Sequence, residues 1–290
     1  MARVREFFAA LSQSKMRLRV ISAAVMVAVA VAAFAIGGPA VCALALVLAA
    51  AMLWEYDAMF AGGKFSLKFL FDLVFVGVPL GAYCLFVGYV PEIPLLAPAA
   101  CFLVLWFCVS MLGYVATNRP RWVLEALPAI YIGLPMLSAV YIYMNASALA
   151  LAYVFVITVS TDTGAFVLGS LIRGPKLAPS ISPKKTWSGA FGGLFCAFVF
   201  GTAFQVWTMW RMDGDFKSAP AWALVSVLLS VLAQAGDLFE SRLKRIVGVK
   251  DSGRLIPGHG GVLDRFDSFL FVVPFVALLA ALFRSGFASP

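Results

Sequence analysis

The sequence predicts an all-α protein that crosses a membrane about nine times and carries two functional polar loops. The chain is 63% hydrophobic and only 12% charged, with a mean hydropathy of +0.97, whereas soluble domains carry about 25% charged residues. Its apolar stretches recur at roughly the 20-residue length that a helix needs to cross a bilayer. Most cations lie in short segments between these stretches. Together these observations predict a polytopic membrane protein.

Nine apolar stretches are long enough to span the membrane, and Gly, Pro or Asn residues mark several of the turns between them. The predicted spans are 18–36, 40–60, 69–90, 94–115, 123–144, 148–170, 188–208, 220–240 and 267–285. Eight or ten spans remain open, because two of the turns, at 91–94 and 145–147, are very short.

The distribution of charge predicts the orientation, because cytosolic loops of membrane proteins carry an excess of Lys and Arg. If the N-terminus is cytosolic, nineteen cations fall on that side, and only Arg211, Lys217 and Arg284 fall outside. We therefore expect the N-terminus and both long polar loops in the cytosol. The net charge of +8 reflects this asymmetry. The sequence has no basic stripe interleaved with aromatic residues, so it does not predict nucleic-acid binding.

The most informative polar segment runs from residue 241 to residue 267, between two apolar stretches. Its six cations are Arg242, Lys244, Arg245, Lys250, Arg254 and Arg265, and its three carboxylates are Asp251, Asp264 and Asp267. This combination suits a metal-bound phosphate, because carboxylates hold the metal and cations contact the phosphate oxygens. The alternative is a basic loop that only sets topology and touches lipid headgroups.

A second polar segment, 173–189, contains three prolines that prevent a regular helix before Lys184. Its Ser182–Thr186 box leads directly into the next predicted span. Hydroxyl groups, two ammonium groups and free backbone N–H groups at a helix N-terminus favour an anion. A proline-rich linker whose lysines anchor at the headgroups is the alternative.

Several acids lie in or beside the apolar stretches. A charge such as Asp162 is costly inside a span and usually faces a polar region, which makes it a candidate site residue. Asp237 and Asp264 flank the 241–267 segment at the ends of two spans, so they can approach each other as a shared metal site requires. Glu55 and Asp57 could lie near the site or at the membrane interface, and we favour the interface.

These motifs resemble those of the CTP-dependent phosphatidate cytidylyltransferases (CDP-diacylglycerol synthases). The family pattern Ser-x-apolar-Lys-Arg, four spacers, Lys-Asp, then Pro-x-His-Gly-Gly-apolar-x-Asp-Arg-apolar-Asp is filled from Ser241 to Asp267. The Ser-Pro-Lys-Lys-Thr box at 182–186 and the run Gly236–Ser241 also match. The resemblance covers roughly residues 160–270. Within one integrated membrane domain it divides the chain into N-terminal helices, 1–150, and a C-terminal catalytic region, 151–290.

The resemblance implies an enzyme of phospholipid biosynthesis, in the bacterial inner membrane, that transfers a cytidylyl group from CTP to phosphatidate and releases pyrophosphate. It implies magnesium held by Asp237 and Asp264, with a second cation for which potassium is the candidate. The residues expected to carry catalysis are Asp237, Asp264, Lys250, Asp251 and Arg265. Those expected to bind substrate are Asp162, Ser182, Lys184, Lys185, Thr186, Lys244, Arg245, His259, Gly260, Gly261 and Asp267. The expected partners are CTP, phosphatidate and the lipid bilayer, and a homodimer is left open.

Two enzyme alternatives and one from another class remain open at this point. A CTP-dependent lipid kinase, or a cytidylyltransferase for another lipid phosphate, would use similar motifs. An ion-coupled transporter would use intramembrane Asp162 and would need no CTP. No general base is identified, since His259 could equally order the backbone of its Gly-rich turn.

Overall fold

The computed structural model describes residues 14–63, 66–86, 103–108, 124, 127–212 and 215–282. Its helical elements are α2 (Ser14–Ile36), α3 (Gly38–Phe60), α4 (Leu67–Phe86), η1 (Ala129–Gly133), α7 (Leu134–Tyr141), η2 (Ile142–Ala146), α8 (Ala148–Ile172), α9 (Trp187–Met212), α10 (Ala219–Val247) and α11 (Leu263–Leu282). Within this part of the chain, eight segments are long and apolar enough to cross a membrane. The predicted all-α membrane fold is confirmed. The predicted span 94–115 lies outside the described residues, apart from the helical residues 103–108.

Two helix ends differ from the prediction and change the shape of the 241–267 segment. α10 continues to Val247 instead of ending near residue 240, and α11 begins at Leu263 instead of residue 267. Gly248 ends α10 because it adopts a left-handed conformation, with a φ of 84°. The irregular loop is therefore only 248–262, and most of the charged residues around it lie on helices.

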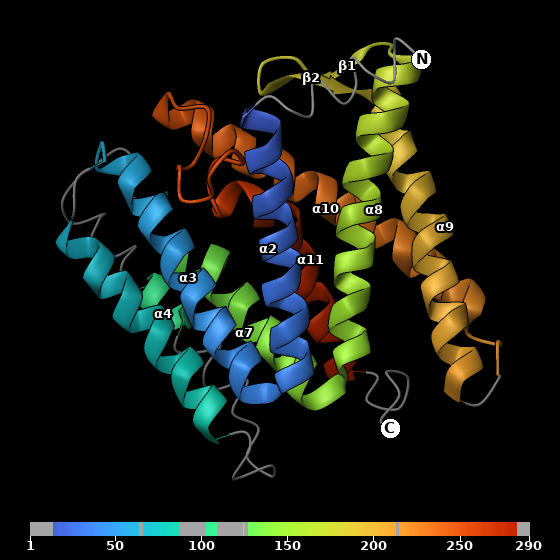
Figure 1. Cartoon of the computed structure of the whole chain (residues 1–290), viewed down its shortest axis with the longest axis horizontal. Helices are drawn as coiled ribbons and strands as arrows, with labels where there is room; N and C mark the ends of the chain where they lie inside the picture. Colours follow the sequence, from blue (N-terminus) through green and yellow to red (C-terminus); the bar gives the residue numbers. More distant parts are fainter. Residues whose placement is uncertain are drawn as a thin grey trace.

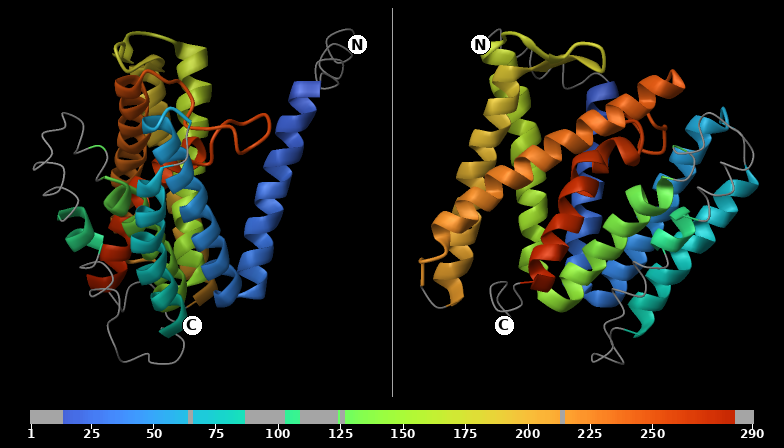
Figure 2. Two further views of the ribbon diagram at one scale, coloured as in Figure 1. Left: turned by 90° about the vertical axis from the view of Figure 1, so that its left-hand side faces the viewer. Right: turned by 180° about the vertical axis from the view of Figure 1, so that it is seen from behind.

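Both polar segments lie at the same end of the molecule, as Figure 1 shows. α8 rises to the segment after Ile172, and α9 leaves from it. α10 crosses the other helices obliquely and reaches the same end, where the 248–262 loop turns the chain back into α11 (Figure 2, right). The turn between α9 and α10 lies at the opposite end. The helix directions thus bring the two predicted functional segments together.

The second polar segment forms a β-hairpin, which the sequence analysis did not predict. Strands β1 (Lys176–Ala178) and β2 (Ser182–Thr186) are antiparallel and pair Lys176 with Thr186 and Ala178 with Ser182. The backbone N–H of Trp187 donates to Pro175 O (3.1 Å) at the base of the hairpin. Pro183 is tolerated within β2 because a two-stranded sheet has only edge strands.

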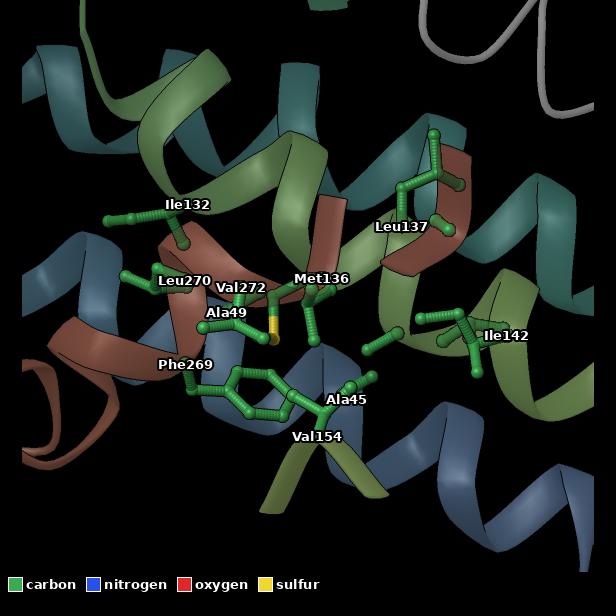
Figure 3. Close-up of a cluster of buried hydrophobic side chains, with 14 of the residues drawn as sticks. Ala45, Ala49, Ile132, Met136, Leu137, Ile142, Val154, Phe269, Leu270 and Val272 are labelled. Carbon is green, nitrogen blue, oxygen red and sulfur yellow. The ribbon is translucent and has the colours of Figure 1, made fainter. Parts of the chain in front are cut away.

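The core joins the first half of the chain to the second. Buried side chains from α3, the η1–α7–η2 run, α8 and α11 pack together (Figure 3). Ala45 and Ala49 of α3 lie against Met136 of α7, Val154 of α8 and Phe269 of α11 in this view. The helices that carry the C-terminal motifs are therefore packed directly against N-terminal ones.

Helix α2 packs less closely than the others. Only 6% of its most apolar stretch is buried, and its upper end stands apart from the neighbouring helices in the left view of Figure 2. There the 248–262 loop reaches toward it. Arg19 Nε donates to Gly258 O (2.9 Å), and Ser22 Oγ lies 2.7 Å from His259 Nδ1. The loop thus has α2 on one side and the end of the helix bundle on the other.

Candidate active site

Two lysines of the predicted site are paired with carboxylates on α10 and α11. Lys185 of β2 lies with its Nζ 2.6 Å from Oδ2 of Asp237 on α10. Lys244, two turns further along α10, lies 2.6 Å from Glu240 Oε2 and 2.7 Å from Asp264 Oδ1 at the start of α11. Glu240 is fully buried, so this second group is an ion cluster removed from solvent. The predicted site residues thus form two ion-paired groups two turns apart on α10: Lys185 with Asp237, and Lys244 with Asp264.

Asp264 is held by several donors at once. Besides Lys244, the backbone N–H of Ser252 donates to both of its oxygens (3.0 and 3.2 Å), and the N–H of Gly261 donates to Oδ2 (3.0 Å). The Gly261 contact reaches back three residues across the start of α11. These contacts fix the orientation of the carboxylate before any ligand binds.

Two further acids add negative charge near Asp237. Asp162 lies on α8 with an exposed side chain, and Ser268 Oγ of α11 donates to its Oδ1 (3.4 Å). Asp267 is buried and accepts from the N–H of Ser268 (2.6 Å). The charges of Asp162, Asp237 and Asp267 interact with one another, and those of Lys185 and Arg265 act on Asp162. The structure thus places Asp162 and Asp267 with the predicted site.

The Ser182–Thr186 box is connected to α10 at a second point. Arg245 Nε donates to the backbone carbonyl of Ile181 (3.3 Å), which ties the tip of the hairpin to the end of α10. Lys184 is exposed and Ser182 is half-buried. Thr186 is buried, and its Oγ1 accepts from Gly189 N (3.1 Å) as an N-cap of α9. Its geometry is that of a helix cap, whereas the sequence led us to expect a hydroxyl free for substrate.

The 248–262 loop holds the remaining predicted residues. Lys250 and Asp251 are exposed, and among the described residues neither has an ion pair or hydrogen bond with the carboxylates above. Gly260 has a φ of 92°, a conformation that favours glycine. Arg265 NH2 donates to the carbonyl of His259 (2.7 Å) and so braces this turn from α11.

His259 faces α2. Its Nδ1 contacts Ser22, and no hydrogen bond joins its ring to a carboxylate within the described part of the chain. Burial lowers the pKa of His259 below its ordinary value of 6.5, and the positive charges of Arg265 and Arg19 lower it further. Both effects favour the neutral form of the ring. This geometry favours the backbone-ordering interpretation of His259.

Glu55 is the site residue that sequence reasoning misplaced. We favoured the membrane interface for it, but the residue is only 1% exposed and reaches into the 248–262 loop. Its Oε2 accepts from Ser252 Oγ (3.2 Å) and from the backbone N–H of Leu263 (2.9 Å). The sequence did carry a signal for this position, because burying a carboxylate in a membrane span is costly and usually has a functional reason. Asp57 is also buried, but it accepts from Ser66 Oγ (2.7 and 2.8 Å) at the turn before α4.

The carboxylates suit a divalent cation in chemistry but do not form a complete set of ligands. No group of three or more His, Cys, Asp or Glu residues in the described ranges is arranged to hold a metal. Magnesium is commonly held by one or two carboxylates together with substrate phosphates and water. Asp237 fits this pattern, since its side chain is 34% exposed and leaves room for other ligands. The lysine ammonium groups beside Asp237 and Asp264 show that each carboxylate already stabilises a positive charge.

Fold and site together define an integral membrane protein with a group of paired lysines and carboxylates at one end of its helices. The model of the cytidylyltransferase family matches residues 17–283. The chain belongs to that family, and the resemblance read from the motifs is confirmed.

Curated relatives match a shorter stretch. The chain is 48% identical over 121 residues to the phosphatidate cytidylyltransferase of Staphylococcus epidermidis strain RP62A, which covers 41% of this chain and 44% of that protein. The protein of the same name from Bacillus subtilis strain 168 is 49% identical over 124 residues, 43% of this chain and 44% of that protein. The matched region thus spans less than half the length of these relatives.

Proposed function

We propose that this chain transfers a cytidylyl group from CTP to phosphatidate, forming CDP-diacylglycerol and pyrophosphate. The observation that carries the proposal is the contact between Lys185 and Asp237. It brings the Ser182–Thr186 box against Asp237 of α10 in a chain of the cytidylyltransferase family. The names of the relatives from Staphylococcus and Bacillus supply the substrate class.

In this reaction a phosphate oxygen of phosphatidate attacks the α-phosphorus of CTP. The bond from that phosphorus to the bridging oxygen breaks, and pyrophosphate leaves with its electrons. No covalent protein nucleophile is needed, so the residues must position the two phosphates and neutralise their charge. Lys185 and Arg265 are suited to hold phosphate oxygens, and the hairpin and the 248–262 loop can close on one ligand from the same end of the molecule.

Asp237 and Asp264 would hold magnesium, which when bound shields the charge on the phosphate oxygens and makes the phosphorus more electrophilic. Lys185 and Lys244, which neutralise these carboxylates in the present structure, would then be free to contact phosphate. The site lies at the helix ends, so the acyl chains of phosphatidate can remain in the lipid while its headgroup binds. We place this end at the cytosolic face of the bacterial inner membrane, on the cation asymmetry alone.

The test uses purified protein, phosphatidate and CTP labelled either in the base or in the γ-phosphate, with and without magnesium. We expect base label in the lipid product only with magnesium, and no γ-phosphate label there. Asp237→Asn and Asp264→Asn should each abolish turnover in protein that still inserts and purifies. Transfer of γ-phosphate label would show a lipid kinase. Failure to bind CTP at all would favour the transporter alternative and overturn the proposal.

A further inference from the structure

The buried carboxylate of Glu55 links the first half of the chain to the proposed metal-binding acid. Glu55 lies on α3, 197 residues from Ser252 and 208 residues from Leu263, yet it accepts hydrogen bonds from both. Ser252 in turn donates its backbone N–H to both oxygens of Asp264. An unbroken chain of contacts therefore runs from α3 through the loop to Asp264.

The loop is shaped around this side chain. A Cβ added to Gly253 would clash with Oε1 of Glu55, and one added to Gly261 would clash with Ser252 Oγ and lie 2.6 Å from Glu55 Oε2. Glycine at these two positions thus lets the loop close over the carboxylate. Oε1 is buried and has no hydrogen-bond partner among the described residues. A purely structural tie between helices would not need a charged group with one oxygen left unsatisfied, because such burial is costly.

We propose that Glu55 is a positioning residue: by fixing Ser252 and the first turn of α11, it sets the orientation of Asp264 for the metal–nucleotide complex. This inference rests on the proposed function. Partners behind a metal ligand typically change metal affinity by about 10- to 100-fold when they are removed. Glu55 contacts Asp264 only through Ser252, so we expect its removal to weaken metal affinity by the lower end of that range.

The experiment measures CTP binding to purified protein as a function of magnesium concentration, alongside kcat and KM for CTP. Glu55→Ala and Ser252→Ala should each raise the magnesium concentration for half-maximal CTP binding, by about tenfold for Glu55→Ala. Glu55→Gln keeps an oxygen acceptor and should lie closer to wild type. The double variant should be no worse than Glu55→Ala, because both changes break the same chain of contacts.

Asp57→Asn is the matched control. It removes a second buried carboxylate two residues away on α3, whose partner is Ser66 rather than the loop. We expect it to lower the thermal stability of the protein without moving the magnesium midpoint. A merely structural role for Glu55 would give the same result in Glu55→Ala as in Asp57→Asn, and that outcome would overturn the inference.

The outcomes separate this inference from the proposed function. If wild-type protein shows neither magnesium-dependent CTP binding nor CDP-diacylglycerol formation, the proposed function fails and the inference fails with it. If wild type shows both and the variants keep its midpoint, only the inference is wrong. Should Glu55→Ala not fold, Ser252→Ala decides, because it removes one hydroxyl and an unchanged midpoint there contradicts the chain of contacts.

Discussion

Two adjacent lysines in the Ser182–Thr186 box have different environments. Successive residues of a strand point to opposite faces, and β2 accordingly places Lys185 against Asp237 while Lys184 is exposed. The sequence predicted that both of them bind substrate. The strand identifies which of the two is already directed at the carboxylates.

We therefore predict that Lys185→Gln lowers the catalytic efficiency more than tenfold, a loss of about 1.4 kcal/mol or more of transition-state stabilisation. Lys184→Gln, the matched control, removes the same charge from the same strand and should have a much smaller effect. Steady-state kinetics with CTP and phosphatidate measure both. Equal effects of the two substitutions would mean that only the net positive charge of the hairpin matters.

At the residue scale, sequence could identify the acids near the site but not their partners. Asp162, Asp237 and Asp264 stand out because a charge beside or within an apolar stretch needs a reason. Glu55 carries the same signal, yet its partners lie about 200 residues away, and nothing local distinguishes it from Asp57. Thr186 shows the converse: a motif position suited to a ligand caps α9 instead.

Helices α8 and α9 approach each other across glycines. A Cβ on Gly192 would lie 2.6 Å from Leu168 Cβ and 2.8 Å from the Gly164 carbonyl. Gly189 and Gly193, which form a small-residue motif in the sequence, face α8 in the same way. Gly77 and Gly81 on α4 have the same four-residue spacing but differ, since a Cβ added to either would meet no described atom within 4 Å. The contact keeps the hairpin, which connects these two helices, in a fixed place.

Gly192→Ala should destabilise the protein by about 1–3 kcal/mol, because the methyl group overpacks a contact that includes backbone atoms. Gly77→Ala should be neutral or slightly stabilising, since alanine favours a helix by about 1 kcal/mol over glycine. Thermal unfolding of the purified proteins in detergent compares the two. A Gly192→Ala variant as stable as Gly77→Ala would show that α8 and α9 separate freely.

At the scale of elements, composition was enough to predict the spans but not their ends. The apolar run stops near residue 240, whereas α10 continues to Val247. Glu240 and Lys244 pair across one helical turn and so support the helix beyond the apolar run. The hairpin could not be predicted from periodicity, since β1 has three residues and β2 has five. Prolines excluded a helix there without indicating what replaces it.

For the whole molecule, the key expectation is that both polar segments face the cytosol. The structure shows that they share one end, while the start of α10, two residues after Lys217, lies at the opposite end. The orientation can be tested by attaching a thiol reagent to single cysteines placed in each segment. Ser252 is a poor position for this, because it is only 5% exposed. Ser180 at the hairpin tip and Arg254 in the loop are exposed and serve better.

In a variant without the five native cysteines, Ser180→Cys and Arg254→Cys should resist a membrane-impermeant thiol reagent added to intact cells. Lys217→Cys should react, because we expect the excess of cations to be cytosolic and this residue directly precedes the end of α10 that lies opposite. Permeabilised cells provide the positive control for all three. Labelling of Ser180→Cys but not Lys217→Cys in intact cells would reverse the topology.

The sparse packing of α2 has a consequence for how such chains diverge over time. Val20, Val25, Val27 and Val31 are each more than half exposed, so in a membrane they meet acyl chains, which accept any apolar side chain of suitable size. Natural selection can distinguish few alternatives there, except around Arg19 and Ser22, where the loop is held. Sequence similarity between related proteins should therefore be lost first along the body of this helix. It should be retained longest around the loop that the helix supports.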